Sequence, residues 1–255
     1  MTAIEATMQA SSTKASSKKA SSMSIPIGRF CGTLAAVISF ALLAPAPVRA
    51  EAVVFRMDIG LPNTVALMVR GQYTGNEILR VKSAIAEIEP GKRIIAVLDS
   101  PGGDVIQGEA LGRFFYDAKI PTLVLAGSVC ASACTYAFLG GRSPVTGNPL
   151  RILASGAKLG FHSFIATGLP ERAYTKAELE EISRATQQLV FRNVAHMIHV
   201  KAPLKIMMLN TGTKNEDINF ITEGDALEYG IAVLDRQSGK LVLPENIDKR
   251  TKARP

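Results

Sequence analysis

The stretch Arg93–Ala126, RIIAVLDSPGGDVIQGEALGRFFYDAKIPTLVLA, alternates strand patterns with a helical pattern. Arg93–Leu98 is typical of a buried strand, the turn Asp99–Gly103 follows it, and Asp104–Ala118 carries apolar residues at helical spacing. Pro121–Ala126 predicts the next strand. A strand, a crossover helix and a second strand in this order indicate a parallel sheet covered by helices.

The same alternation continues on both sides of this stretch. Upstream, Thr64–Gly71 predicts a strand, and Thr74–Glu77 has the form of a capping box that opens a helix ending at Pro90-Gly91. Downstream, the sequence predicts an apolar helix over Ser132–Leu139, a Gly/Pro-rich loop over 140–156, a strand over Ala157–Phe161, a long amphipathic helix over Thr175–Val200 with Glu178 completing a capping box, short helices near Leu204–Asn210 and Glu223–Tyr229, and a strand over Ile231–Leu234. We therefore expect an α/β fold of repeated strand-turn-helix units with a mainly parallel sheet, in a single domain over residues 51–255.

The first fifty residues do not have the pattern of a folded domain. Residues 1–22 are rich in Ser, Ala and Lys and lack apolar periodicity, so we expect disorder there. Residues 23–50 combine a basic start, an apolar run and a small-residue end, which predicts a secretory signal peptide cleaved after Ala50. The protein would then be periplasmic or secreted. An uncleaved membrane anchor over residues 31–44 is the alternative, and translation beginning at Met23 stays open.

The charge and the histidines argue against some classes of function. Of the 29 basic and 22 acidic residues, five and one lie within residues 1–50, which leaves a net charge of about +3. No basic stripe with interleaved aromatic residues is present, so we do not expect nucleic-acid binding. His196 and His199 have a metal-like spacing but no matching Cys or carboxylate nearby. We interpret them as helix-face residues and expect no metal and no cofactor.

Two turns between a strand and a helix could carry chemistry. In Leu98–Gly103, consecutive glycines allow bare N–H groups to approach a ligand, although a plain glycine turn has the same sequence. In Gly127–Thr135, GSVCASACT, small residues surround Ser132 at the start of a buried helix. Such a serine can cap the helix, or it can be a nucleophile whose neighbouring N–H group faces an oxyanion. His162 follows a short strand, where a lone histidine is more often structural than catalytic.

The order of these motifs resembles the proteolytic subunit of the Clp protease and its relatives. Asp99–Gly103, the Ser132 turn opening an apolar helix, and a strand followed by His162 occur in the order of that family. The tail Asn219–Ile231 is similar to the family's closing segment, in which a Phe-Leu-Ser motif precedes Ala-x-Glu-Tyr-Gly-Leu. The resemblance covers roughly residues 64–235 and implies the ClpP/crotonase-like fold.

The resemblance also implies a site and an activity. It makes Ser132 the nucleophile and His162 the general base, with an oxyanion hole formed by the N–H groups of Gly103 and Ala133. The expected function is that of a serine peptidase, a hydrolase that cleaves peptides or proteins through an acyl-enzyme. Family members form homo-oligomers through the helix that corresponds to Thr175–Val200. The ATPase partner of the cytosolic protease is not expected after export.

The third member of the expected triad is where the sequence departs from the family. The family's aspartate lies two residues before the Phe of the closing segment, and Ile218 occupies that position here. Asp217 is one position away and is the candidate acid, while Lys158 would be the base of an alternative Ser-Lys dyad. A catalytically silent protein that binds peptides or partner proteins, and crotonase-like acyl-thioester chemistry, are the other functions considered.

Two cysteines flank the candidate nucleophile. Cys31 leaves with the predicted signal peptide, so the mature chain would keep Cys130 and Cys134 in an oxidising compartment. These two could form a disulfide that rigidifies the nucleophile turn, or they could be two small buried thiols. A spacing of four residues is awkward for a disulfide on one continuous helix, but Cys130 is expected to precede the helix.

Overall fold

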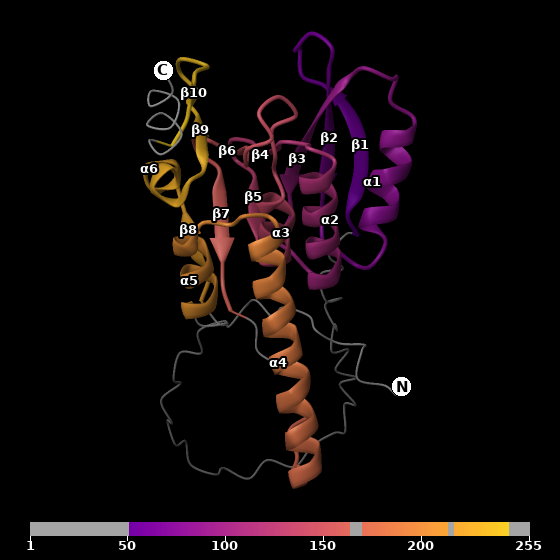
Figure 1. Ribbon diagram of the computed structural model, residues 1–255, viewed down its shortest axis with the longest axis vertical. Helices are drawn as coiled ribbons and strands as arrows, with labels where there is room; N and C mark the ends of the chain where they lie inside the picture. The colour runs from indigo at the N-terminus through magenta and orange to yellow at the C-terminus, as the bar shows by residue number, and fades with distance from the viewer. Residues whose placement is uncertain (1–50, 164–169, 214–216, 245–255) are drawn as a thin grey trace, which may run out of the picture.

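A computed structural model describes residues 51–163, 170–213 and 217–244. Its centre is a seven-stranded sheet in the order β1-β2-β3-β4-β6-β9-β10, which can be followed across Figure 1. The strands are β1 (Val53–Asp58), β2 (Thr64–Arg70), β3 (Arg93–Asp99), β4 (Thr122–Val124), β6 (Arg151–Ala154), β9 (Ala232–Leu234) and β10 (Leu241–Val242). A second sheet holds three strands in the order β5 (Val129–Ala131), β7 (Lys158–Phe161) and β8 (Asn219–Ile221). The predicted disordered segment and signal peptide lie outside the described residues.

The middle of the large sheet is parallel and its margins are antiparallel. The parallel pairs are β2 with β3, β3 with β4, β4 with β6, and β6 with β9. The antiparallel pairs β1 with β2 and β9 with β10 close the two margins. The α/β class and the mainly parallel sheet predicted from the sequence are therefore confirmed.

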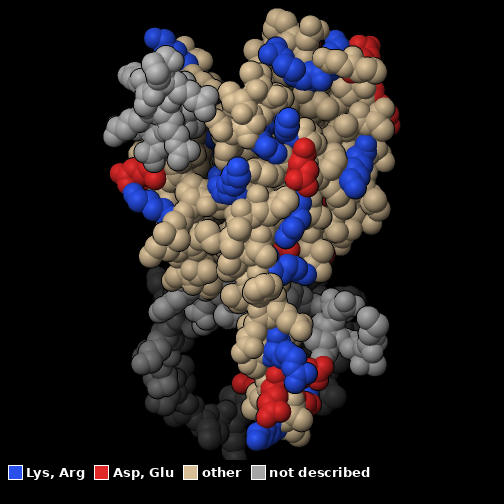
Figure 2. All heavy atoms as spheres, in the orientation of Figure 1, with Lys and Arg blue, Asp and Glu red and all other residues tan. Residues whose placement is uncertain are grey.

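Helices connect the parallel strands and cover the sheet. They are α1 (Glu77–Ala86), α2 (Val105–Asp117), α3 (Ala133–Leu139), α4 (Lys176–His199), α5 (Leu204–Gly212), α6 (Glu223–Ala226) and the short 3-10 turn η1 (Leu227–Tyr229). Helix α4 begins at a capping box between Thr175 and Glu178, as predicted, and its first half projects from the body (Figure 1). Charged side chains of both signs gather on that projecting end (Figure 2). No helix within the described ranges has the length and apolar character needed to span a membrane.

The structure corrects two of the sequence predictions. The predicted loop 140–156 contains strand β6, which is fully buried between β4 and β9. Helix α1 is capped at Asn76 and not at Thr74, and no side-chain cap bond is formed. The Glu77 carboxylate instead accepts hydrogen bonds from the backbone N–H groups of Thr74 at 2.7 Å and Gly75 at 3.0 Å. The predicted capping box at this helix is therefore wrong.

Close packing of α2 on α3 fixes the position of the Ser132 turn. A Cβ on Gly108 would lie 2.1 Å from the Ala133 carbonyl oxygen, and one on Gly112 would lie 2.2 Å from that of Tyr136. Side chains at these two glycines would therefore force the helices apart, because interiors leave no free space for added atoms. Helix α3 is buried along its whole length, so its first residue is held firmly against the rest of the domain.

Candidate active site

Ser132 lies alone between the last residue of β5 and the first residue of α3. Its backbone has φ 55° and ψ −126°, outside the regions that residues with side chains usually occupy. Such a conformation costs on the order of 1–3 kcal/mol and is kept when the surroundings enforce it. A serine on a sharp turn from a strand into a helix is the arrangement that presents a nucleophile in many hydrolases.

The Ser132 backbone is held on both sides. Its N–H group donates to the carbonyl oxygen of Gly160 at 3.0 Å, and its own carbonyl accepts from the Thr135 hydroxyl at 2.7 Å. The side chain does not cap α3. Helix capping therefore does not account for the presence of a hydroxyl here, although it was the simpler interpretation of the sequence. The residue is only 4% exposed.

A disulfide joins the residues on either side of this turn. Cys130 in β5 and Cys134 in α3 are bonded to each other, and neither has any exposed surface. Their Cα atoms lie 5.2 Å apart, which is an ordinary separation for bridged cysteines. The bond therefore ties the end of the strand to the first turn of the helix, with Ser132 between them.

The glycine turn packs directly against Ser132. A Cβ on Gly102 would lie 2.7 Å from the Ser132 Cβ and 2.9 Å from the Ala133 nitrogen. The Gly102 N–H group donates to the Ser100 hydroxyl at 3.0 Å, whereas the Gly103 N–H group has no hydrogen-bond partner within the described residues. The Ala133 N–H group lies at the first position of α3, where a helix offers no internal acceptor. Neither N–H group assigned to an oxyanion hole thus has a hydrogen-bond acceptor among the described residues.

His162 follows β7, the strand next to the one that ends at Ser132. Strands β5 and β7 are parallel with Ala131 opposite Gly160, so their carboxyl ends lie side by side. His162 is 4% exposed, and its Nδ1 lies 2.9 Å from the Ser163 carbonyl oxygen. A carbonyl can only accept a hydrogen bond, so Nδ1 is the ring nitrogen that carries the proton in this contact.

The Ser163 carbonyl is itself fixed in place, but the two candidate catalytic side chains are not bonded to each other. The Ser163 N–H group donates to the Thr213 carbonyl oxygen at 2.9 Å. Within the described part of the chain, no hydrogen bond joins the Ser132 hydroxyl to His162, which has a further interaction besides the one with Ser163. Catalytic hydrogen bonds are often long in the absence of substrate and tighten in the complex.

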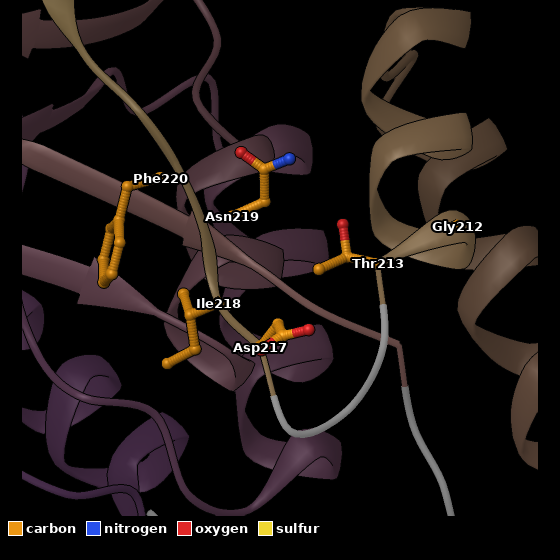
Figure 3. Close-up of a pocket in the computed structure, with 6 residues that line it drawn as sticks. All are labelled: Gly212, Thr213, Asp217, Ile218, Asn219 and Phe220. Carbon is orange, nitrogen blue, oxygen red and sulfur yellow. The ribbon is translucent and has the colours of Figure 1, made fainter.

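The register of β7 and β8 places Ile218, and not Asp217, nearest to His162 along the strands. Strand β8 is antiparallel to β7 with Asn219 opposite Phe161, and extending this register by one residue puts Ile218 opposite His162. Ile218 and Phe220 lie over Gly160, on one face of the strand. Asp217 is exposed and points away from Ile218 (Figure 3).

Lys158 is also separated from the nucleophile. It begins β7, opposite Val129, whereas His162 follows the other end of that strand. Its side chain is exposed, and the ammonium lies 6.0 Å from the centre of the Phe220 ring. Lys158 and His162 thus lie at opposite ends of β7, and His162 is the one at the end next to Ser132.

His196 and His199 point to different surroundings. The Nε2 atom of His196 lies 3.1 Å from the Tyr136 carbonyl oxygen in the core, and burial lowers the pKa of this histidine to about 4. The Nε2 atom of His199 lies 3.0 Å from the Asp117 carboxylate at the surface. Among the described residues, no group of three or more His, Cys, Asp or Glu side chains could hold a metal ion.

Sequence reasoning missed the supporting residues of the site. Ser100 is 1% exposed and holds the glycine turn through Gly102, and Gly160 anchors the Ser132 backbone. The motif Asp-Ser-Pro-Gly-Gly contains Ser100 and Gly102, but nothing in the motif distinguishes the roles of these two residues from the role of Gly103. No protein-family model matches the chain, and no curated protein matches it significantly.

Proposed function

We propose that this chain is an exported serine peptidase with the ClpP/crotonase-like fold, in which Ser132 is the nucleophile and His162 the general base. The observation that carries this proposal is the Ser132 backbone, with φ 55° and ψ −126° and a hydroxyl that caps nothing. A conformation of this cost is typical of sites where a side chain must be presented at a fixed angle.

In the proposed reaction, the Ser132 hydroxyl oxygen attacks the carbonyl carbon of a peptide bond while the Nε2 atom of His162 takes the proton. The N–H groups of Gly103 and Ala133 stabilise the negative charge that develops on the carbonyl oxygen. His162 then returns the proton to the leaving amine. A water molecule, deprotonated by the same ring, releases the acyl group from Ser132.

The Ser163 carbonyl performs the orienting role of the acid in this proposal. Its hydrogen bond with Nδ1 selects the ring tautomer that can act as a base. A carbonyl has only a partial negative charge, so it stabilises the imidazolium less than a carboxylate does. Replacing the acid of a serine protease triad lowers kcat by about 10⁴, and we expect slow turnover here for the same reason.

The fold and the location belong to the same proposal. Strand-turn-helix units around a mainly parallel sheet, with the glycine turn, Ser132 and His162 at strand ends, agree with the ClpP/crotonase-like arrangement. A disulfide is stable in an oxidising compartment and rare in the cytosol, which supports a periplasmic or secreted location. An uncleaved anchor over residues 31–44 remains the alternative.

We assign peptides or proteins as substrates and a second copy of the chain as the partner. Helix α4 supports an assembly role because its first half projects from the body and Phe191, in its second half, is 77% exposed. Exposed aromatic residues on a projecting helix are typical of contact surfaces between proteins. No ATPase partner is part of this proposal, since an exported chain would not meet the cytosolic one.

A serine-directed fluorophosphonate probe tests the proposed nucleophile. We expect the full chain to be labelled at neutral pH and the label to be lost in Ser132→Ala. Ser128→Ala is the matched control, because Ser128 is a buried serine, 7% exposed, at the opposite end of β5 from Ser132, and its loss should leave labelling unchanged. Labelling that persists in Ser132→Ala, or a folded wild-type chain that does not react, would contradict the proposal.

One observation favours a second candidate function, a peptide-binding protein without turnover. Ile218 occupies the register position opposite His162, and Asp217 points elsewhere. An apolar residue there fits a binding groove better than a proton relay. Peptide binding that survives Ser132→Ala, together with no probe labelling of the wild-type chain, would identify this function.

A further inference from the structure

The disulfide between Cys130 and Cys134 encloses the one non-glycine residue of the site whose backbone is strained. Only Ala131, Ser132 and Ala133 lie between the two cysteines. The bond therefore acts on the φ and ψ angles of the candidate nucleophile more directly than any other covalent link could. It lies within the site and not at the margin of the domain.

The restraints that remain without the disulfide are noncovalent. The β-bridge between Ser100 and Cys130 holds the strand end, and the contact of Gly108 with the Ala133 carbonyl holds the helix. The Ser132 N–H group still donates to Gly160, and the Ser132 carbonyl still accepts from Thr135, but only the disulfide joins the two ends of the turn covalently. Without the disulfide, Ser132 can relax toward a backbone conformation of lower energy.

We infer that formation of the Cys130–Cys134 disulfide switches the site on. The reduced chain folds with Ser132 in a relaxed turn, and oxidation brings its hydroxyl and the Ala133 N–H group into the competent arrangement. The two thiols lose two protons and two electrons to a disulfide oxidant, which becomes a dithiol while the sulfur–sulfur bond forms. This inference rests on the proposed function of Ser132.

The burial of the bond makes the switch a step of maturation. Both cysteines are 0% exposed, so a dithiol reductant cannot reach the sulfur atoms in the folded chain. A peptidase that becomes active only when oxidised would be harmless before export. The partner that the inference requires is a thiol–disulfide oxidant in the compartment to which the chain is delivered, and it must react with the two thiols in the relaxed turn of the reduced chain, before the sulfur atoms become buried.

The test compares labelling rates of the full chain in a Cys31→Ala background, which removes the third cysteine. The fluorophosphonate rate is measured for the oxidised chain and for Cys130→Ala/Cys134→Ala, at a temperature at which circular dichroism shows both to be folded. We expect the double variant to label at least about tenfold more slowly, because only a fraction of the chains hold the competent turn. Reduction of the oxidised chain with a phosphine during mild unfolding and refolding gives the same state without substitution.

A control separates positioning from general stability. Val233→Ala lies in β9, and Val233 is 7% exposed, so the substitution lowers the melting temperature without touching the site. It should label at the wild-type rate. The pH midpoint of labelling should stay the same in the double variant, since His162 is unchanged, while the maximal rate falls.

Each outcome decides the inference. Labelling of the double variant within twofold of the oxidised chain overturns it and leaves the proposed function intact. A double variant and a reduced chain that are both unfolded also overturn it, because the disulfide would then serve folding alone. If the oxidised, folded chain is not labelled, the proposed function fails and the inference falls with it.

Discussion

The Ser132 turn and strand β8 border the same candidate site, but they are constructed differently. Ser132 is buried, held by a disulfide, and packed against Gly102 with no room for a methyl group. Strand β8 is a three-residue edge strand whose Asn219 and Phe220 are exposed, and it is preceded by an exposed Asp217. The half that would bind the oxyanion is thus tightly enclosed, whereas the half that would supply the acid is open to solvent. If the proposed function holds, this difference predicts a site that holds an acyl group well and transfers protons slowly.

The largest expected effect comes from filling the contact between the two turns. In Gly102→Ala the new methyl carbon would lie 2.7 Å from both the Ala131 oxygen and the Ser132 Cβ, so the oxyanion hole cannot keep its shape. We expect probe labelling to fall at least about 100-fold, as for loss of an oxyanion donor. Labelling rates of folded protein check this.

Gly127→Ala is the matched control for that substitution. Gly127 also has a positive φ of 78°, but a Cβ there would meet nothing within 4 Å. It should therefore show the backbone cost alone, about 1 kcal/mol, with labelling close to that of the wild type. Equal labelling of Gly102→Ala and Gly127→Ala would show that the close contact between Gly102 and Ser132 is not needed for reaction with the probe.

The pH dependence of stability tests the packing of α4 against α3, the helix that follows Ser132. His196 of α4 donates from Nε2 to the Tyr136 carbonyl of α3, and its Nδ1 is buried without a partner among the described residues. Burial lowers its pKa to about 4 in the folded chain, against roughly 6.5 when unfolded. Between these values the unfolded chain binds more protons, so the free energy of unfolding falls as the pH falls, by up to about 3 kcal/mol.

Urea unfolding at neutral pH and near pH 4.5 (roughly midway in that window) measures this loss. His196→Gln, which has no titrating ring, should lose less stability over the same change. Glu109 contributes with the opposite sign, because burial raises its pKa and the folded chain gains protons as the pH falls. Glu109 is present in both the wild-type chain and His196→Gln. The difference between their changes in unfolding free energy with pH is therefore due to His196. Parallel pH dependences of the two chains would contradict the prediction.

The sequence predicts the Ser132 turn and the glycine turn better than it predicts the position of strand β8. The glycine turn and the small residues around Ser132 are local requirements of close backbone packing, so they are visible in the sequence. The orientation of Asp217 depends on the pairing register of a short edge strand, and a shift by one residue reverses the face of every side chain. A pattern of residue types does not contain that register.

Strand β6 was missed for a similar reason. It begins with Arg151, which is 2% exposed, and a charged residue next to Gly/Pro-rich sequence predicts a loop. In the structure the guanidinium donates to the carbonyl oxygens of Leu139 and Val200, at the ends of two helices distant in sequence. Burial lowers the pKa of Arg151 to about 10. Partners that come together only in the folded chain cannot be inferred from the strand itself.

Loss of the disulfide should lower the free energy of unfolding by about 2 kcal/mol or less. The loop from Cys130 to Cys134 is short, with a sequence separation of 4, so its closure contributes about 2 kcal/mol through the entropy of the unfolded chain. This is comparable to the roughly 1–3 kcal/mol that the Ser132 backbone costs, so the disulfide can offset that strain. Urea midpoints of the oxidised chain and of Cys130→Ala/Cys134→Ala measure the difference, and identical midpoints would refute this estimate.

The smallest effect is expected from supplying the open half with an acid. Ile218→Asp places a carboxylate opposite His162 in the β7–β8 register, where it can stabilise the imidazolium. We expect labelling to rise about tenfold and its pH midpoint to move upward, since a nearby negative charge raises the pKa of a histidine. Asp217→Asn is the control and should change the rate less than twofold, because Asp217 is exposed and faces away. If Asp217→Asn abolishes labelling while Ile218→Asp leaves it unchanged, Asp217 is the orienting acid in solution and strand β8 must shift its register when the site is at work.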